Sequence, residues 1–159
     1  MTLKLRPIPP DGDAVGLAGE LAAGFGEDEA AALDILEQTI RHLKKVPRPD
    51  PWGSYLAYAD ETAVGTCAFK GAPDSVGLVE IAYMTFPAFE RRGHAGAMTA
   101  ALVAIAATGG ASTAIAHTLP QENASNRALR RNGFVFAGQV DDPEDGPVWR
   151  WEKPLGRLA

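Results

Sequence analysis

The chain has 159 residues, of which 46% are hydrophobic and 22% are charged. These proportions are those of an ordinary globular protein, so they exclude a disordered or fibrous chain, and the length predicts a single domain over residues 1–159. Fifteen basic against twenty acidic residues give a net charge of −5, which argues against nucleic acid as a partner and favours small or cationic molecules.

The N-terminal half begins with a short alternating segment. Alternation over 3–8 predicts a first strand, which ends at two prolines. Apolar residues at helical spacing then predict helices over 14–25 and 28–45, before three prolines interrupt the chain between 46 and 53. The first residues lack the apolar segment of a secretion signal, and no stretch approaches the roughly eighteen apolar residues of a membrane helix. We therefore expect a cytoplasmic protein with no membrane partner.

Between residues 54 and 86 the hydrophobic pattern changes to a period of two. The segments are SYLAYA (54–59), AVGTCAFK (63–70) and GLVEIAYMTF (77–86), which are rich in aromatic and β-branched residues. They predict three consecutive antiparallel strands. The single cysteine, Cys67, lies in an apolar run and is expected to be a small buried side chain. One thiol also excludes an internal disulfide and a multi-thiolate metal site.

The C-terminal half alternates helices and strands. Its patterns predict a helix over 93–107, a strand over 112–119, a helix over 123–132, and strands over 134–140 and 146–155 around the acidic turn DDPEDG. The complete order of elements predicts an α+β fold. Its core would be a mixed, mostly antiparallel sheet of about seven strands flanked by four helices.

The junction FPAFERRGHAG joins a predicted strand to the start of a predicted helix. Pro87 ends the strand, and Arg91 and Arg92 lead into a helical turn of small residues. The first amides of a helix have no partner inside it, and the helix dipole adds positive potential there. The junction therefore suits a phosphate or pyrophosphate group. On spacing alone, an ordinary helix start with a surface arginine pair is the alternative.

Together with a later segment, this junction resembles the GNAT superfamily of acyl-CoA-dependent N-acetyltransferases. The family signature P-x-x-[QR]-x-x-G-x-[GA] is similar to Pro87, Glu90, Gly93 and Ala95. The family's later turn, helix and Gly-Phe are similar to NASNRALRRNGF, a version most similar to the branch that acetylates ribosomal-protein N-termini. The resemblance implies a GNAT fold and transfer of an acetyl group from acetyl-CoA to a primary amine. The amine, on a small molecule or a peptide N-terminus, would attack directly in a ternary complex.

The resemblance also implies where coenzyme A would bind. The pyrophosphate would lie on the backbone amides of Arg91, Arg92, Gly93, His94, Ala95 and Gly96. The pantetheine arm would pair with Tyr83, Met84 and Thr85, because the family's fourth strand splays from its fifth and leaves strand backbone exposed. The turn that contacts pantetheine or the leaving thiol would contain Asn123, Ser125 and Asn126. Neither a metal nor a covalent enzyme intermediate is implied.

Three positions depart from the family pattern. Glu90 replaces Gln or Arg, Glu122 holds the usual place of Asn, and Leu129 replaces a frequent catalytic Tyr. Without that Tyr, Ser125 or a water would have to reprotonate the departing thiolate. These departures leave open a second function, a CoA-binding or dimerising module with little or no turnover. A homodimer is a possible assembly in either case.

Two residues compete for the role of general base, which takes a proton from the attacking amine. Glu80 lies on the strand that leads to the pantetheine site, where it would also face the acceptor. His117 ends the next strand, and histidine titrates near neutral pH. A solvent-facing strand residue and a hydrogen-bonded strand end are the alternative roles of the two. Trp52 follows the proline-rich segment and is expected either to close over the acceptor or to pack in the core.

Overall fold

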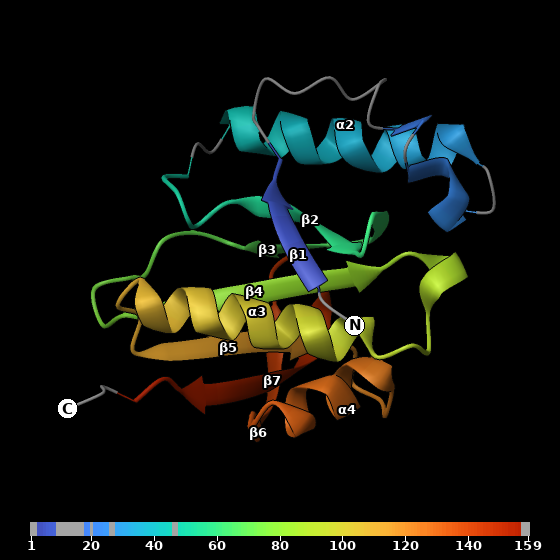
Figure 1. Cartoon of the computed structure of the whole chain (residues 1–159). Helices are drawn as coiled ribbons and strands as arrows, with labels where there is room; N and C mark the ends of the chain where they lie inside the picture. The colour runs from blue at the N-terminus through green and yellow to red at the C-terminus, as the bar shows by residue number, and fades with distance from the viewer. Residues whose placement is uncertain (1–2, 9–17, 20, 26–27, 46–47, 157–159) are drawn as a thin grey trace.

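A seven-stranded mixed sheet forms the centre of the structure (Figure 1). Its strands are β1 (Leu3–Pro7), β2 (Ser54–Ala59), β3 (Thr62–Phe69), β4 (Leu78–Thr85), β5 (Thr113–Thr118), β6 (Val135–Asp142) and β7 (Gly146–Pro154). In the sheet order β1-β2-β3-β4-β5-β7-β6, every neighbouring pair is antiparallel except β4 and β5, which are parallel. The computed structural model describes residues 3–8, 18–19, 21–25, 28–45 and 48–156.

Three α-helices lie in the part of the chain that the structure describes: α2 (Glu29–Lys45), α3 (His94–Thr108) and α4 (Ala124–Arg131). Each confirms a predicted helix to within one residue at either end. Short 3-10 turns, η1 (Ala22–Phe25) and η2 (Pro87–Phe89), precede α2 and α3. Of the remaining helix expected, over 14–25, the structure describes residues 18–19 and 21–25; residues 18, 19 and 21 are α-helical, and Ala22–Phe25 form the 3-10 turn η1 instead of continuing the α-helix. None of the helices described is long and apolar enough to cross a membrane.

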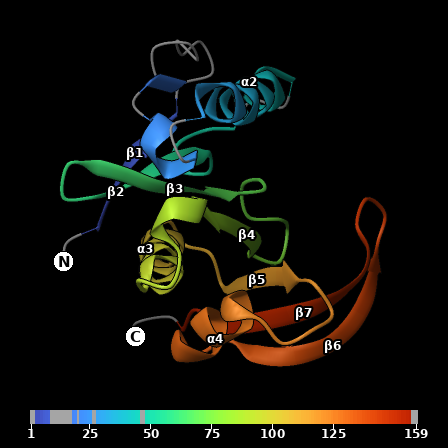
Figure 2. The same ribbon diagram turned by 90° about the vertical axis from the view of Figure 1, so that its right-hand side faces the viewer.

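The strands confirm the predicted α+β class and the antiparallel run of β2, β3 and β4, with strand ends within two residues of those expected. Helices pack on both faces of the sheet (Figure 2). Adjacent residues of β2 point to opposite faces, as strand geometry requires. Leu56 packs in a cluster with Leu36 of α2, whereas Ala57 belongs to the main core with Leu102 of α3.

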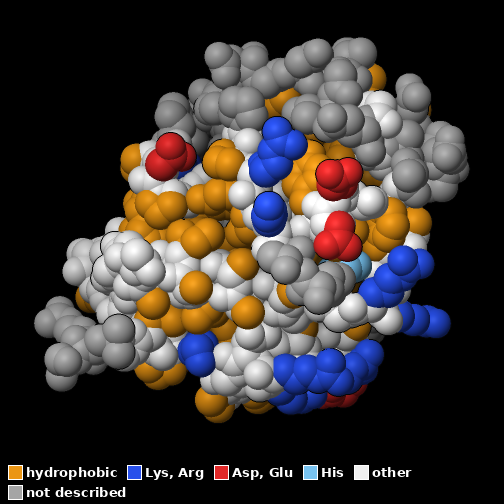
Figure 3. Space-filling model, in the orientation of Figure 1, with side chains coloured by type: hydrophobic (Ala, Val, Ile, Leu, Met, Phe, Trp, Pro, Cys, Tyr) orange, Lys and Arg blue, Asp and Glu red, His pale blue; other side chains and the backbone are white. Residues whose placement is uncertain are grey.

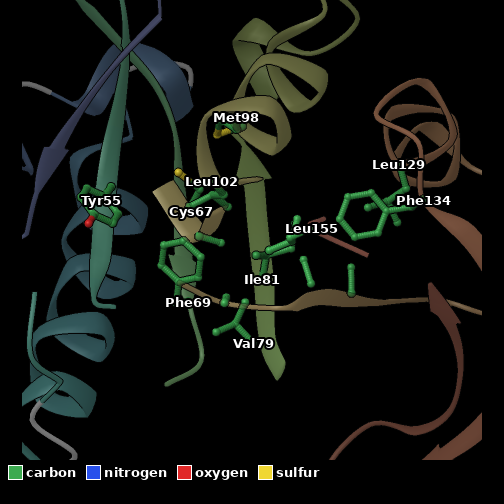
Figure 4. Close-up of a cluster of buried hydrophobic side chains, with 14 of the residues drawn as sticks. Tyr55, Cys67, Phe69, Val79, Ile81, Met98, Leu102, Leu129, Phe134 and Leu155 are labelled. Atoms are coloured by element: carbon green, nitrogen blue, oxygen red, sulfur yellow. The ribbon is translucent and has the colours of Figure 1, made fainter. Parts of the chain in front are cut away.

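The main core lies between the sheet and the buried face of α3 (Figure 4). Met98 and Leu102 of this helix meet Phe69 and Ile81 of the sheet, and all four side chains are fully buried. Most of the remaining residues of α3 are Ala, Gly or Thr. Such small side chains let the helix approach the sheet closely. The first turn of α3 is therefore fixed at one end of the strands, next to the end of β4.

Strands β4 and β5 part before either of them ends. Their parallel pairing runs from Leu78 opposite Thr113 to Ile81 opposite Ala116. Beyond that point β4 pairs only with β3, and β5 only with β7. The register confirms the splay that the family resemblance implies. It leaves the backbone of the last residues of β4 without a strand on that side.

Candidate active site

A pocket of about 250 Å³ lies where β4 and β5 part. Its walls come from the ends of both strands and from the segment that leads into α4, and they include Tyr83, His117, Asn123 and Ser125. These four residues are far apart in the sequence and were each predicted to belong to the site. The fold brings them together around one cavity, although no single stretch of chain contains more than two of them.

Glu80 and His117 form one hydrogen-bonded pair beside this pocket. The Nδ1 atom of His117 lies 3.1 Å from the Oε2 atom of Glu80. Register explains the contact, because Glu80 stands opposite Ile115, and His117 is two residues further on and so points to the same face. Both side chains are largely shielded from solvent, at 21% exposed for Glu80 and 16% for His117. A proton on Nδ1 would be donated to Glu80 and would leave Nε2 as a free acceptor.

Lys70 also contacts this pair, and sequence reasoning missed it. Its Nζ atom lies 3.0 Å from Oε2 of Glu80, the same oxygen that faces His117. Lys70 directly follows β3, where a solvent-facing lysine at a strand end is commonplace. Only the pairing of β3 with β4 places it opposite Glu80, so the residue alone carries no signal.

Tyr83 crosses the pocket from β4 toward α4. Its hydroxyl donates a hydrogen bond to the backbone carbonyl of Ser125, at 3.2 Å. Burial raises the pKa of Tyr83, against the opposing effect of hydrogen bonds with Thr99 and Ser125, so the phenol is protonated at neutral pH. The other two residues expected to meet pantetheine, Met84 and Thr85, continue β4 beyond the pocket, opposite Thr66 and Gly65 of β3.

The start of α3 presents free backbone donors. Gly93 caps the helix with a left-handed φ of 84°, and Arg91 is also left-handed, at 66°. Among the described residues, the backbone amides of 91–96 donate no backbone hydrogen bond. The first amide of this segment that does donate one is that of Ala97, to the Gly93 carbonyl at 3.1 Å. A Cβ atom on Gly93 would meet nothing within 4 Å. The approach to these amides is therefore open.

The side chains around this turn fit an anionic group. Arg91 and Arg92 are exposed, and basic side chains gather over the start of α3 and over α4 (Figure 3). His94, in the first turn, is buried. Burial and the charge of Arg92 lower its pKa, so it is neutral at neutral pH. Its Nδ1 atom is buried without a hydrogen-bond partner in the described part of the chain. Ala95 and Gly96 add no bulk that would screen their own amides.

The turn before α4 is held by two asparagines. Asn123 caps the helix and accepts a hydrogen bond from the Asn126 amide at 3.0 Å. The fully buried Asn126 side chain donates to the carbonyl of Gln121 at 2.7 Å. Its Oδ1 atom has no partner among the residues described. These hydrogen bonds hold the turn that places Ser125 at the pocket.

The positions that depart from the family pattern face away from the pocket. Glu122 forms a two-pronged ion pair with Arg130, with N–O distances of 2.9 and 2.8 Å. The hydrogen bond from Arg130 is the main cause that lowers the pKa of Glu122. Leu129 is fully buried beside Phe134 in the core (Figure 4). Glu90 is exposed at the end of η2. None of the three lines the pocket.

Trp52 does not join this site. Its ring packs edge-on against Phe69, with centroids 5.0 Å apart, and a Cβ atom on Gly109 would lie 2.7 Å from it. Gly109 follows the last turn of α3, whereas the pocket lies near the first. A helix of 15 residues spans about 22 Å. Of the two roles expected for Trp52, the structure therefore places it in the core.

A family model for the acetyltransferase (GNAT) domain matches residues 2–135. No curated protein sequence matches the chain significantly. Many solved structures share the fold, including three acetyltransferases. The acetyltransferase of Salmonella typhimurium that modifies the N-terminal serine of the 50S ribosomal protein L7/L12 is 17% identical, with a TM-score of 0.71 over 98% of this chain and 96% of that one. RimL, a ribosomal L7/L12 α-N-protein acetyltransferase in complex with coenzyme A, is 16% identical. Its TM-score is 0.69, over 96% of this chain and 94% of that one. The microcin C7 self-immunity acetyltransferase MccE, in complex with acetyl-CoA and AMP, is 14% identical. Its TM-score is 0.71, over 96% of this chain and 92% of that one.

Proposed function

Because the chain belongs to the GNAT acetyltransferase family, we propose that it transfers the acetyl group of acetyl-CoA to a primary amine, which attacks the thioester directly at the pocket between β4 and β5. The observation that carries this proposal is the Glu80–His117 pair, which lies beside the cavity at the point where the strands part. A titratable side chain there is in reach of an amine that enters the pocket. The free amides of 91–96 would anchor an extended cofactor whose reactive end reaches the same cavity.

Coenzyme A would be held by backbone more than by side chains. The amides of 91–96 would donate to the pyrophosphate, with the α3 dipole behind them. The exposed backbone of Tyr83, Met84 and Thr85 would pair with the pantetheine arm as a neighbouring strand would. Asn123 lines the pocket and would contact the same arm. Acetyl-CoA, once bound, supplies the activated acyl thioester.

His117 would act as the general base. An alkylamine with a pKa near 10 is largely protonated at neutral pH, so a proton must leave before or during attack. Glu80 would accept the Nδ1 proton and fix the tautomer in which Nε2 is unprotonated. In this proposal the two residues weighed as rival bases share one role. His117 takes the proton, and Glu80 orients the imidazole ring of His117.

Ser125 would return a proton to the departing thiolate and regain one from solvent, to which His117 releases the proton of the amine. It lines the pocket, and the hydrogen bond from Tyr83 to its carbonyl fixes the turn that carries it. The backbone amides near Met84 and Thr85 would stabilise the charge that develops on the carbonyl oxygen of the acyl group. The groups proposed to act on the amine and the thioester thus come from β4, β5 and the start of α4.

The acceptor would be a peptide N-terminus or a small amine. Two of the structural neighbours are acetyltransferases that act on the N-terminus of ribosomal protein L7/L12. An α-amino group has a pKa near 8 and is more readily deprotonated than a lysine side chain. A peptide N-terminus is therefore the acceptor that the site can activate with least difficulty.

Thiol release from acetyl-CoA tests this function. Purified protein is mixed with acetyl-CoA and either a panel of short peptides with free N-termini or a panel of small amines, and free thiol is followed against time. We expect amine-dependent release that is lost in His117→Gln, with coenzyme A affinity retained in that variant. Tight binding of coenzyme A without thiol release for any amine would instead support a CoA-binding module.

A further inference from the structure

Lys70 is joined to Glu80 by both backbone and side chain. Its amide donates to the Glu80 carbonyl at 2.9 Å, and its Nζ atom lies 3.0 Å from Oε2 of the carboxylate. The Nδ1 atom of His117 lies 3.1 Å from that same oxygen. One carboxylate oxygen therefore stands between an ammonium group and an imidazole ring. Glu80 and His117 lie on the neighbouring strands β4 and β5, and Lys70 directly follows β3.

We propose that Lys70 is a positioning residue for the Glu80–His117 pair. Its ammonium group holds the Glu80 carboxylate in place and opposes a positive charge on the imidazole of His117. The inference rests on the proposed function, in which His117 is the base. A base that already carries a proton cannot take one from the amine. Lys70 would therefore extend activity toward lower pH, without contact with the acceptor or with coenzyme A.

Lys70 is charged throughout the working range of pH. Burial alone lowers its pKa, but the hydrogen bond and charge of Glu80, together with the charges of Asp142 and Asp145, outweigh that effect and raise it. The ammonium is half exposed, at 48%, whereas Glu80 is 21% exposed. The interaction is therefore partly screened by solvent, and a moderate effect is expected.

The other charged groups that face His117 lie on β6 and β7. Arg150 stands opposite His117 in the register, but its Nε atom is engaged by Glu152 at 2.8 Å. The Asp142 carboxylate accepts the amides of Glu144 and Asp145, which are the main cause that lowers its pKa, and it also interacts with Lys70 and His117. Of the charged side chains in this group, Lys70 is the cation in direct contact with Glu80.

Loss of the ammonium should favour the imidazolium form. Glu80 would then have His117 as its remaining positive partner, and a proton on His117 would be held more tightly. In Lys70→Met we expect the acid limb of the pH profile of turnover to move up by about 0.5 pH unit, the size typical of a half-exposed ion pair. Activity on the acid side of that limb would fall about threefold, and activity above it would be unchanged.

The test compares Lys70→Met with Lys70→Arg, which keeps the charge, and with Lys4→Met, which removes an exposed lysine of β1. Turnover is measured from pH 5.5 to 9, and the ring resonances of His117 are followed by NMR over the same range. Only Lys70→Met should move the acid limb and the His117 titration together, with coenzyme A affinity unchanged in all three. An unmoved titration, or an equal shift in Lys70→Arg, would overturn the role of Lys70.

The two proposals fail in different ways. If His117→Gln retains turnover, His117 is not the base and the proposed mechanism fails, whatever the NMR titration shows. If His117→Gln abolishes turnover but Lys70→Met leaves both the limb and the titration in place, the mechanism stands and Lys70 has no positioning role. A thermal melt of each variant confirms that both readings come from folded protein.

Discussion

The Nδ1 atom of His117 lies 3.1 Å from the Oε2 atom of Glu80, across two parallel strands that separate just beyond them. This contact joins the partly buried faces of β4 and β5 at the edge of the pocket. It links the two residues chemically, because the tautomer of the ring decides whether Nδ1 donates to the Glu80 carboxyl group. A substitution of either residue therefore affects the Nε2 atom of the imidazole ring.

Substitution of the two residues should give graded losses of turnover. His117→Gln removes the proton acceptor and should lower kcat about a hundredfold. Glu80→Gln leaves the ring in place but weakens its orientation, and should lower kcat about tenfold. The measurement is the steady-state rate of thiol release, with coenzyme A affinity from calorimetry as the control. A larger loss in Glu80→Gln than in His117→Gln would assign the proton transfer to the carboxylate instead.

Trp52 should matter for stability and not for the acceptor. Trp52→Ala removes a buried ring that contacts Phe69 and Gly109, and should cost about 3–5 kcal/mol of unfolding free energy. Trp52→Phe keeps an aromatic ring in the same place and should retain the wild-type KM for the amine. Phe136→Ala, at a half-exposed aromatic of β6, provides a milder control for the denaturant curves. A raised KM for the amine in a stable Trp52→Phe variant would mean that Trp52 does contribute to acceptor binding.

Most of the fold follows from local patterns in the sequence. The strands and the helices α2, α3 and α4 lie within two residues of their predicted bounds, because the hydrophobic period changes sharply from helical to alternating at residue 54. The turn at the start of α3, where we propose that pyrophosphate binds, is equally visible in the sequence, since Gly93 and its neighbours lie in one short segment. The splay of β4 from β5 required the family resemblance, because no residue of either strand marks the place where pairing stops.

Relationships between distant segments were beyond the reach of the sequence. Glu80 and His117 were weighed as rivals because nothing in the sequence sets the register of β4 against β5, and register alone puts their side chains in contact. Trp52 follows a proline-rich segment that also suits a lid, and its true neighbour, Gly109, lies far along the chain. Lys70 was overlooked for the same reason, since its role depends on a partner in the next strand.

The buried thiol of Cys67 should make stability depend on pH in the alkaline range. Burial raises its pKa to about 12, whereas an unfolded thiol ionises near about pH 8.5. Stabilisation from a raised pKa is complete below the unfolded value and is lost as pH rises toward the folded one. Between about pH 9 and 12, this thiol should therefore lower the free energy of unfolding by up to about 1.4 kcal/mol per pH unit.

Urea unfolding at pH 8, 9 and 10 measures this slope. Cys67→Ala lacks the thiol, so the difference between wild type and variant isolates it from the tyrosines and lysines that titrate in the same range. We expect the two free energies to converge as pH rises. Parallel curves would mean that the thiol is already accessible to solvent in the folded protein.

A matched pair of glycines at the two ends of α3 can test the pyrophosphate turn. Gly93 and Gly110 have φ of 84° and 88°, and a Cβ atom on either meets nothing within 4 Å, so a glutamate at each should cost a similar backbone strain, of about 1–2 kcal/mol. Gly93→Glu also places a negative charge on the amides of 91–96, and should weaken coenzyme A binding by about a hundredfold or more. Gly110→Glu should melt at a temperature similar to that of Gly93→Glu, and calorimetry should show that it binds coenzyme A as wild type does. Gly93→Ala, which adds no charge, should lose little affinity for coenzyme A. Equal affinities in the two glutamate variants would mean that the cofactor's phosphates bind elsewhere.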